Sequence, residues 1–299
     1  MSRRYPRLVA QTMTTGDDRA EGSTPARPIV VDGGGPRSWQ RAFGDLGQGW
    51  KQRPLWGYLG WQDIKQRYRR SVLGPLWVSI SMAVVATAMG ILYGALFQMD
   101  IATFLPYVAT GLLIWNFVNG CILEGSEVFI ANEGLIRFLP APISLHVYRL
   151  LWRQTLFFLH NLVIWLLLVI IFPQPLSATV LLALPAFVLL VLNGLWLALL
   201  AGIIATRFRD IPPIIASLTQ LLFFMTPIVW SYERLKSNPL AAYVELNPVM
   251  HFVEILRQPL LGQPIVWRHW AVVGVITVVG CAVSLICLRN YRSRVAYWV

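Results

Sequence analysis

The sequence predicts an all-α integral membrane protein with six transmembrane helices, and three observations support this fold class. The chain is 56% hydrophobic and only 13% charged, whereas a soluble domain carries about 25% charged residues. Long apolar runs alternate with short polar gaps from Gly74 onward. No run alternates with period two as barrel strands do, so helices must satisfy the backbone hydrogen bonds in lipid.

The first 48 residues are predicted to form a flexible cytoplasmic tail. This segment mixes charged residues and prolines with the glycine-rich run 33–36, and it lacks the apolar stretch of a signal peptide. Such a composition cannot bury enough apolar surface to offset the entropy lost on ordering.

Residues 49–73 are predicted to form an amphipathic helix in the cytoplasmic membrane interface. Trp61, Ile64, Tyr68 and Val72 are spaced three, four and four residues apart, so they would share one helix face. The charged residues assigned to the remaining surface are Asp63, Lys65, Arg67, Arg69 and Arg70. Arginines suit lipid headgroups and aromatic rings suit the boundary below them. A generic membrane anchor explains this pattern as well as a specific functional element does.

Residues 74–288 contain six apolar runs, each long enough to cross about 30 Å of hydrocarbon. The predicted spans are residues 74–97, 104–123, 147–172, 178–205, 212–231 and 268–288. A short helical element is expected before the last span, within residues 247–261, where apolar residues recur at helical spacing between prolines.

The positions of arginine and lysine predict that both termini are cytoplasmic. Basic residues precede the first span, and they follow the second span at Arg137, the fourth span within 206–210 and the last span in the tail 289–299. The gaps 98–103 and 173–177 contain none. The net charge of +11 therefore indicates membrane lipids as partners, not nucleic acid.

Polar and aromatic residues within the apolar runs are candidates for a substrate path. The candidates are Trp77, Trp115, Asn119, His160, Asn161 and Trp230. Polar groups in lipid usually face other helices or a water-filled passage, so interhelical hydrogen bonds are the competing explanation. An interfacial aromatic belt explains most of the tryptophans in the same way. No metal site and no catalytic residue is predicted.

Four motifs resemble the ABC-2 type exporter permeases, in particular the polysaccharide-export branch that serves O-antigen, capsule and teichoic acid. The first is the order Asp63-Ile64-Lys65, Arg67-Tyr68, Ser71, Leu73-Gly74 and Trp77, in which Gln62 stands where that branch often has Arg. The others are 132–142, 210–230, and 247–249 followed by Arg257. Because Arg outnumbers Lys 22 to 3, as in GC-rich bacterial genomes, an actinobacterial galactan exporter is a candidate for the particular member.

The resemblance implies a homodimer of six-span subunits in the bacterial inner membrane, with two copies of a separate cytoplasmic ATPase. Such a complex would export a lipid-linked polysaccharide. The sequence contains no G-x-x-x-x-G-K-[ST] phosphate loop. We therefore expect a transport subunit and no enzyme, without a cofactor of its own, whose partner binds ATP and Mg.

The gap after the second span is the predicted ATPase-coupling segment. Its residues are Asn132, Glu133, Leu135, Ile136, Arg137, Phe138 and Pro140. An amphipathic turn of this kind inserts into a groove on a partner and carries the partner's movement into the adjoining helices. An ordinary interfacial connector is the alternative interpretation.

Two other functions compete with polysaccharide export. An integral-membrane transferase acting on lipid-linked sugars would place carboxylates and histidine in a large loop. The loop 232–267 offers Glu233, Glu245, His251 and Glu254 without nucleotide or metal spacing. An ABC-2 permease for small lipids or drugs shares the fold, and only the branch-specific motifs argue against it.

Overall fold

The computed structural model describes residues 38–74, 76–138 and 141–299. Residues 1–37 of the predicted tail and Pro140 of the predicted coupling segment lie outside this part of the chain. The described residues form helices, turns and irregular segments, with no β-strand among them. The predicted all-α class is therefore confirmed.

Within the part of the chain that the structure describes, five helices are long and apolar enough to cross a membrane. They are α3 (Leu76–Phe97), α4 (Ile101–Glu127), α6 (Ser144–Ile171), α7 (Ala183–Arg207), which the short η2 (Ala178–Leu182) precedes, and α11 (Trp267–Trp298). These helices coincide with five of the six predicted spans, because a sustained apolar run is a local property of the sequence.

The predicted span 212–231 is shorter in the structure than the sequence suggested. Helix α8 (Ile211–Met225) has 15 residues, which is about 22 Å at the rise of an α-helix and less than the hydrocarbon thickness. Thr226 is extended because Pro227 follows it and disfavours helical backbone in the preceding residue. Tyr107 Oη and Arg257 Nη1 donate to the Pro227 carbonyl at 3.0 and 2.7 Å and hold the turn.

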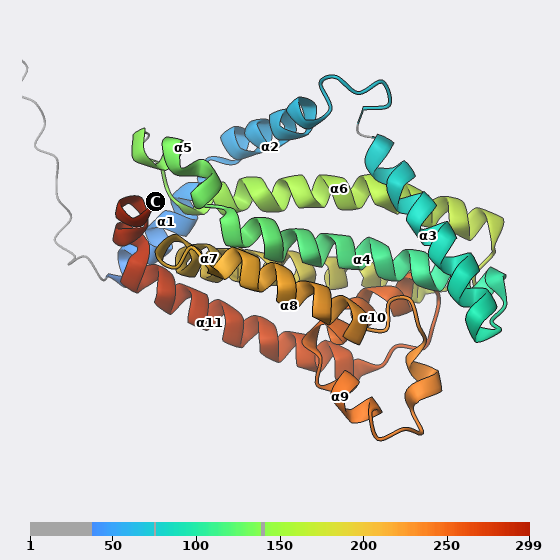
Figure 1. The fold of residues 1–299 in the computed structure, drawn as a ribbon. Coiled ribbons are helices and arrows are strands. Elements are labelled where there is room, and N and C mark those ends of the chain that lie inside the picture. Colours follow the sequence, from blue (N-terminus) through green and yellow to red (C-terminus); the bar gives the residue numbers. More distant parts are fainter. Residues whose placement is uncertain (1–37, 75, 139–140) are drawn as a thin grey trace, which may run out of the picture. The chain divides into compact units, whose positions relative to one another are not determined.

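Helix α4 is the centre of the described helices. Its most apolar stretch is 72% buried, compared with 22% for the corresponding stretch of α3. It packs against α3, α6, α7, α8 and α10, and Figure 1 shows it between α6 and α7. The exposed apolar surface of α3 is what a lipid-facing or subunit-facing helix presents.

Two helices precede α3, and the first of them lies partly in the predicted tail. Helix α1 (Trp39–Lys51) packs on α6 and α11 through Ala42, Asp45 and Gly49. The prediction of a flexible tail to residue 48 is therefore wrong for residues 39–48. A Cβ atom at Gly49 would clash with Ser144 Oγ, so this glycine lets α1 approach α6 closely.

The predicted interface helix 49–73 corresponds to α2 (Arg53–Arg67), which packs on α6. Ile64 is buried as expected, but the helix ends before Tyr68, and Val72 is fully exposed. The shared apolar face was therefore predicted too long, because the chain turns at residues 68–74 and Gly74 adopts a positive φ of 54°.

The expected helical element before the last span is present. Helices η3 (Tyr232–Leu235), α9 (Ala241–Glu245) and α10 (Pro248–Leu260) precede α11. The Asn247 side chain accepts from the Val249 amide and caps α10, which is buried on all sides.

Residues 289–299, which the sequence assigned to a cytoplasmic tail, continue helix α11 to Trp298, and Val295 and Val299 are buried. The connection between α4 and α6 forms η1 (Ile130–Asn132) and α5 (Glu133–Phe138). Helices α1 and α5 both contact α11. We call this end of the helices the α5 end and the opposite end the α9 end.

Candidate functional site

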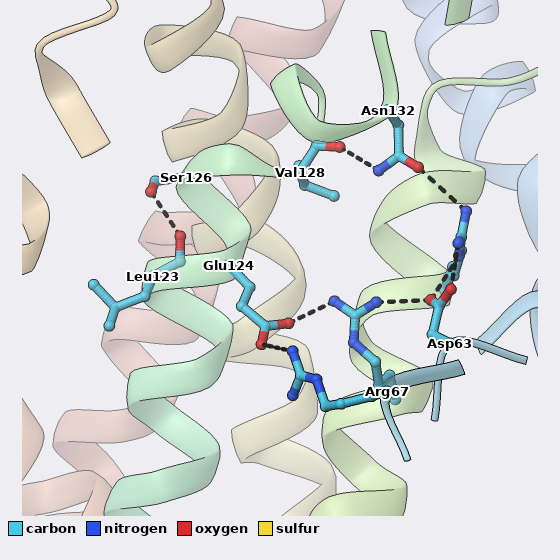
Figure 2. A network of polar contacts seen from close by, with 9 residues as sticks. Asp63, Arg67, Leu123, Glu124, Ser126, Val128 and Asn132 are labelled. Atoms are coloured by element: carbon cyan, nitrogen blue, oxygen red, sulfur yellow. Dashed lines mark hydrogen bonds and ion pairs between the residues drawn. The ribbon is translucent and has the colours of Figure 1, made fainter. Parts of the chain in front are cut away.

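A network of charged side chains joins α2 to α4 and α6 near the α5 end, and Figure 2 shows Asp63, Arg67 and Glu124 within it. Asp63 of α2 accepts from Arg149 Nε at 2.8 Å and from Arg153 Nη1 at 2.7 Å. Arg153 also pairs with Glu124 of α4, and Arg67 Nη2 lies 3.5 Å from the same carboxylate. We call these five residues the charge network.

Burial and ion pairing shift the pKa of Asp63 in opposite directions. Burial alone would raise the pKa of its carboxyl group, but hydrogen bonds and positive charge from Arg149 and Arg153 outweigh that effect. The pKa of Asp63 is therefore held below its ordinary value of 3.8. The sequence had placed Asp63 on the outer polar face of its helix, and the structure turns it inward against α6.

The charge network extends to the predicted coupling segment through Asn132. Arg149 Nη1 donates to Asn132 Oδ1 at 3.2 Å, and Asn132 Nδ2 donates to the Val128 carbonyl at 2.7 Å (Figure 2). The sequence had treated Arg149 and Arg153 only as markers of orientation. Their spacing of four residues at the start of an apolar helix is the signal that they share one partner.

The coupling segment exposes apolar side chains. Leu135 is 39% exposed and Phe138 is 86% exposed, whereas Ile136 packs against the core. Glu133 and Arg137 form an ion pair of 2.9 Å, and Arg137 Nε donates to the main-chain oxygen of Val299 at 3.1 Å. Helix α5 is therefore fastened to α11 while its outer apolar face stays uncovered.

Asp45 is a connecting residue that the sequence did not reveal. Its side chain is completely buried and accepts from the amides of Ile143 and Ser144, at 3.2 and 3.0 Å, where α6 begins. Arg292 Nε of α11 donates to it at 2.6 Å. A carboxylate at a helix N-terminus satisfies free amides and complements the helix dipole. The available signal was a lone acidic residue among small and aromatic ones in residues 39–51.

A cavity of about 500 Å³ lies between α3, α4 and α6. It brings together three of the six predicted path residues, Trp77, Asn119 and Asn161. Arg67 and Tyr68 line it as well, and so do Asn116 and Gln154, which the prediction had not included in the path. We call this space the amide cavity.

The other three predicted path residues lie elsewhere. Trp115 packs against Phe223 of α8, with ring centroids 5.4 Å apart. His160 Nδ1 lies 2.7 Å from the Leu156 carbonyl of its own helix, and Trp230 Nε1 donates to the Phe224 carbonyl. Sequence spacing gave their depth along the helices but not the direction of their side chains.

A second cavity, of about 610 Å³, lies at the α9 end and is lined by charged groups of the loop 232–267. Three carboxylates there are paired, Glu233 with Lys236 at 2.6 Å, Glu245 with Arg268 at 2.8 Å and Glu254 with Arg257 at 2.8 Å. Hydrogen bonds from Arg268 and Tyr232 lower the pKa of Glu245 to about 2. Carboxylates held in ion pairs are poorly suited to the acid–base chemistry that a transferase would require.

Comparison with known proteins gives one family and several relatives. Residues 54–261 match the family described as ABC-2 type transporter. Two Klebsiella pneumoniae proteins named O-antigen export system permease protein RfbA are 19% and 20% identical to this chain, over 74% and 79% of it and 87% and 91% of their own length. A Myxococcus xanthus protein of the same name is 24% identical over 63% of this chain and 73% of its own. The matched range contains the charge network and the amide cavity.

Proposed function

The chain belongs to the ABC-2 type transporter family, and from this premise we propose that it is the permease subunit that exports a lipid-linked polysaccharide. It is a multi-pass protein of the bacterial inner membrane and a transport subunit. The relatives' names, O-antigen export permease, support a glycan as the cargo. ATP and Mg would be bound by a separate ATPase subunit, because the sequence has no phosphate loop.

The observation that carries this proposal is the exposed face of α5. Phe138, with 86% of its surface exposed, and Leu135 form an apolar projection at the α5 end. Arg137 ties this projection to α11, and Asn132 ties it to α6 through Arg149. A groove on the ATPase that received Phe138 would therefore move two long helices together. We infer two copies of each subunit.

For the topology we propose six crossings with both termini cytoplasmic. The placement of arginine and lysine supports this orientation. Helix α8 followed by the turn 226–230 would supply the sixth crossing. In a protein without its native cysteines, a cysteine at Lys236 should react with an impermeant label from outside, and a cysteine at Arg292 only after lysis.

The arginines that follow α2 are candidates for the charged head of the carrier lipid. Arg69 and Arg70 are exposed, and Arg67 lies at the amide cavity beside Glu124. Arginine donates two parallel hydrogen bonds to a phosphate, and lysine does not. Replacing all three by lysine should therefore lower export while insertion persists. Normal export by this variant would contradict phosphate recognition and would indicate that these arginines only attract bulk anionic lipid.

The experiment that tests the function uses the chain and its ATPase reconstituted together in vesicles. We expect ATP-dependent transfer of a lipid-linked glycan, and no ATP hydrolysis by the chain alone. Phe138→Ser should weaken ATPase binding or separate hydrolysis from transfer. Tyr243→Ser is the matched control, because this aromatic is 64% exposed at the α9 end.

Transfer of small lipids or drugs without glycan transfer would favour the alternative permease function. Hydrolysis of a lipid-linked sugar by the isolated chain would favour the transferase. Equal coupling in the Phe138 and Tyr243 variants would contradict the role assigned to α5.

A further inference from the structure

Four side-chain amides line the amide cavity. Asn116 and Asn119 come from α4, and Gln154 and Asn161 come from α6. Within the described residues, none of these four side chains forms a hydrogen bond. Asn161 is only 3% exposed and Gln154 only 5%, and Asn161 Oδ1 is buried without a partner. Buried polar groups in proteins are normally paired, so Asn161 and Gln154 require a partner from outside the chain, and the more accessible Asn116 and Asn119 are free to bind the same partner.

Asn193, another asparagine within the apolar helices, has a fully hydrogen-bonded side chain and serves as a comparison. Asn193 of α7 donates to the Leu189 carbonyl at 2.8 Å and to Thr277 Oγ1 at 2.7 Å, and it accepts from Trp196 Nε1 at 2.8 Å. Both polar atoms of that amide are paired, and its nitrogen joins α7 to α11 through Thr277. The amides of the amide cavity differ because their capacity is left unused.

Gly120 leaves room for the Gln154 amide. A Cβ atom at Gly120 of α4 would approach the Gln154 amide carbon to 2.7 Å and its nitrogen to 2.9 Å, closer than real Cβ contacts allow. Any larger residue at Gly120 would therefore displace the Gln154 side chain. The cavity thus combines unpaired amides with a position that has no side chain.

The chemistry of the lining specifies a neutral ligand rich in hydroxyl groups. An amide both donates and accepts, as a hydroxyl group does. The wall from α3 is mainly apolar, with Val78, Met82 and Val85. Arg67 and Glu124 are the charged residues of the lining, and they pair with each other. A ligand with hydroxyl groups on one side and C–H groups on the other matches this surface.

The extent of the cavity suits more than one sugar ring. Its lining on α4 runs from Leu112 to Glu124, which is roughly 18 Å at 1.5 Å per residue. Its volume of about 500 Å³ lies within the usual range of ligand sites. Arg67 stands at the Glu124 end, where a phosphate group would meet a guanidinium.

We propose that the amide cavity binds the sugar residues next to the carrier phosphate, through Asn116, Asn119, Gln154 and Asn161. This proposal rests on the proposed function, since it assigns one part of the lipid-linked glycan to one site. The sugar hydroxyls would satisfy the four amides, and the C–H faces would lie on α3. Recognition would then start with the lipid-proximal sugars, before the rest of the glycan is engaged.

The test compares two probes on the purified complex of the chain and its ATPase. One probe is polyprenyl pyrophosphate carrying two neutral hexoses, and the other is bare polyprenyl pyrophosphate. We expect the sugar-bearing probe to stimulate ATP hydrolysis with a half-saturating concentration about tenfold lower, because several hydrogen bonds are gained. Asn161→Leu and Gln154→Met should abolish this preference by raising the half-saturating concentration of the sugar-bearing probe to that of the bare probe.

Matched variants separate binding from folding. Asn193→Leu removes a paired amide, so it should lower thermal stability and keep the preference for the sugar-bearing probe. Gly120→Ala displaces Gln154 without removing an amide, so it should reduce the preference even where Asn161→Leu fails to fold.

Three outcomes would overturn the proposal. They are equal half-saturation by the two probes in the wild type, an undiminished preference in the amide variants, and a change in thermal stability alone. A complex stimulated by both probes equally would contradict the sugar site and leave the export function standing. A complex stimulated by neither probe would contradict both the sugar site and the export function.

Discussion

The charge network and the amide cavity share helices α4 and α6 and treat polar groups in opposite ways. In the charge network, Asp63 accepts from both arginines of α6, and Glu124 accepts from Arg153 and Arg67. One residue further along α6, Gln154 begins the set of unpaired amides. Paired groups fix the positions of helices, whereas unpaired groups remain available to a ligand.

Substitutions in the two regions should therefore affect the stability of the protein in opposite ways. Removing one member of a buried ion pair leaves its partner's charge uncompensated. Replacing an unpaired amide by an apolar side chain of similar size removes a polar group that had no partner. Stability and transport should therefore respond separately in the two regions.

The largest effect is expected for Asp63→Ala. This change removes the carboxylate that Arg149 and Arg153 share, so Arg149 loses its anionic partner among the described residues, and the free energy of unfolding should fall by about 3 kcal/mol. Thermal unfolding of the purified protein in detergent measures it. Glu233→Gln is the control, since its pair with Lys236 is mostly exposed and should contribute less than about 1 kcal/mol. Equal losses in the two variants would contradict the distinction between buried and surface pairs.

A smaller loss is expected for Asp45→Asn. The amide keeps an oxygen for the start of α6 but removes the charge that pairs with Arg292, so the cost should be about 2 kcal/mol. Arg292→Lys should retain most of the stability and Arg292→Gln should not. The same unfolding assay tests this, and identical behaviour of the two Arg292 variants would contradict an ion pair.

Asn161→Leu should separate stability from transport. Because its Oδ1 is buried without a partner, the substitution should leave stability unchanged or raise it by up to about 1 kcal/mol. Glycan transfer in reconstituted vesicles should fall. Asn193→Leu should do the reverse, with lower stability and little direct effect on transfer. If Asn161→Leu destabilised the protein, Asn161 would have a structural role like that of Asn193.

The smallest effect concerns pH. The folded pKa of Asp63 lies below its ordinary 3.8, so its stabilising contribution is complete above about pH 4 and is lost as the pH falls through the folded value. The difference in melting temperature between the wild type and Asp63→Asn should therefore be constant from pH 7 to pH 5. It should shrink only below about pH 4. A difference that shrinks near neutral pH would point to another group.

Some of the candidate site was predictable because it depends on local pattern. The helical spacing of residues 132–138 predicted an amphipathic segment, and α5 exposes Leu135 and Phe138 as that pattern requires. The polar residues Asn119 and Asn161 stood out in apolar runs, and both line the amide cavity. The partner of Asp63 was not predictable, because Arg149 lies 86 positions away in the sequence.

The sequence by itself determined the helical class, the apolar runs, and the distribution of arginine and lysine that underlies the proposed orientation, since each depends on composition within one segment. Only the tertiary structure decided that α1 is a packed helix, that α8 ends at Met225, and that Asp45 joins α6 to Arg292, 247 residues away. The physical reason is that a helix can present a polar residue to any neighbour. Which neighbour it meets depends on how the other helices pack, and that packing has no signature within a single segment.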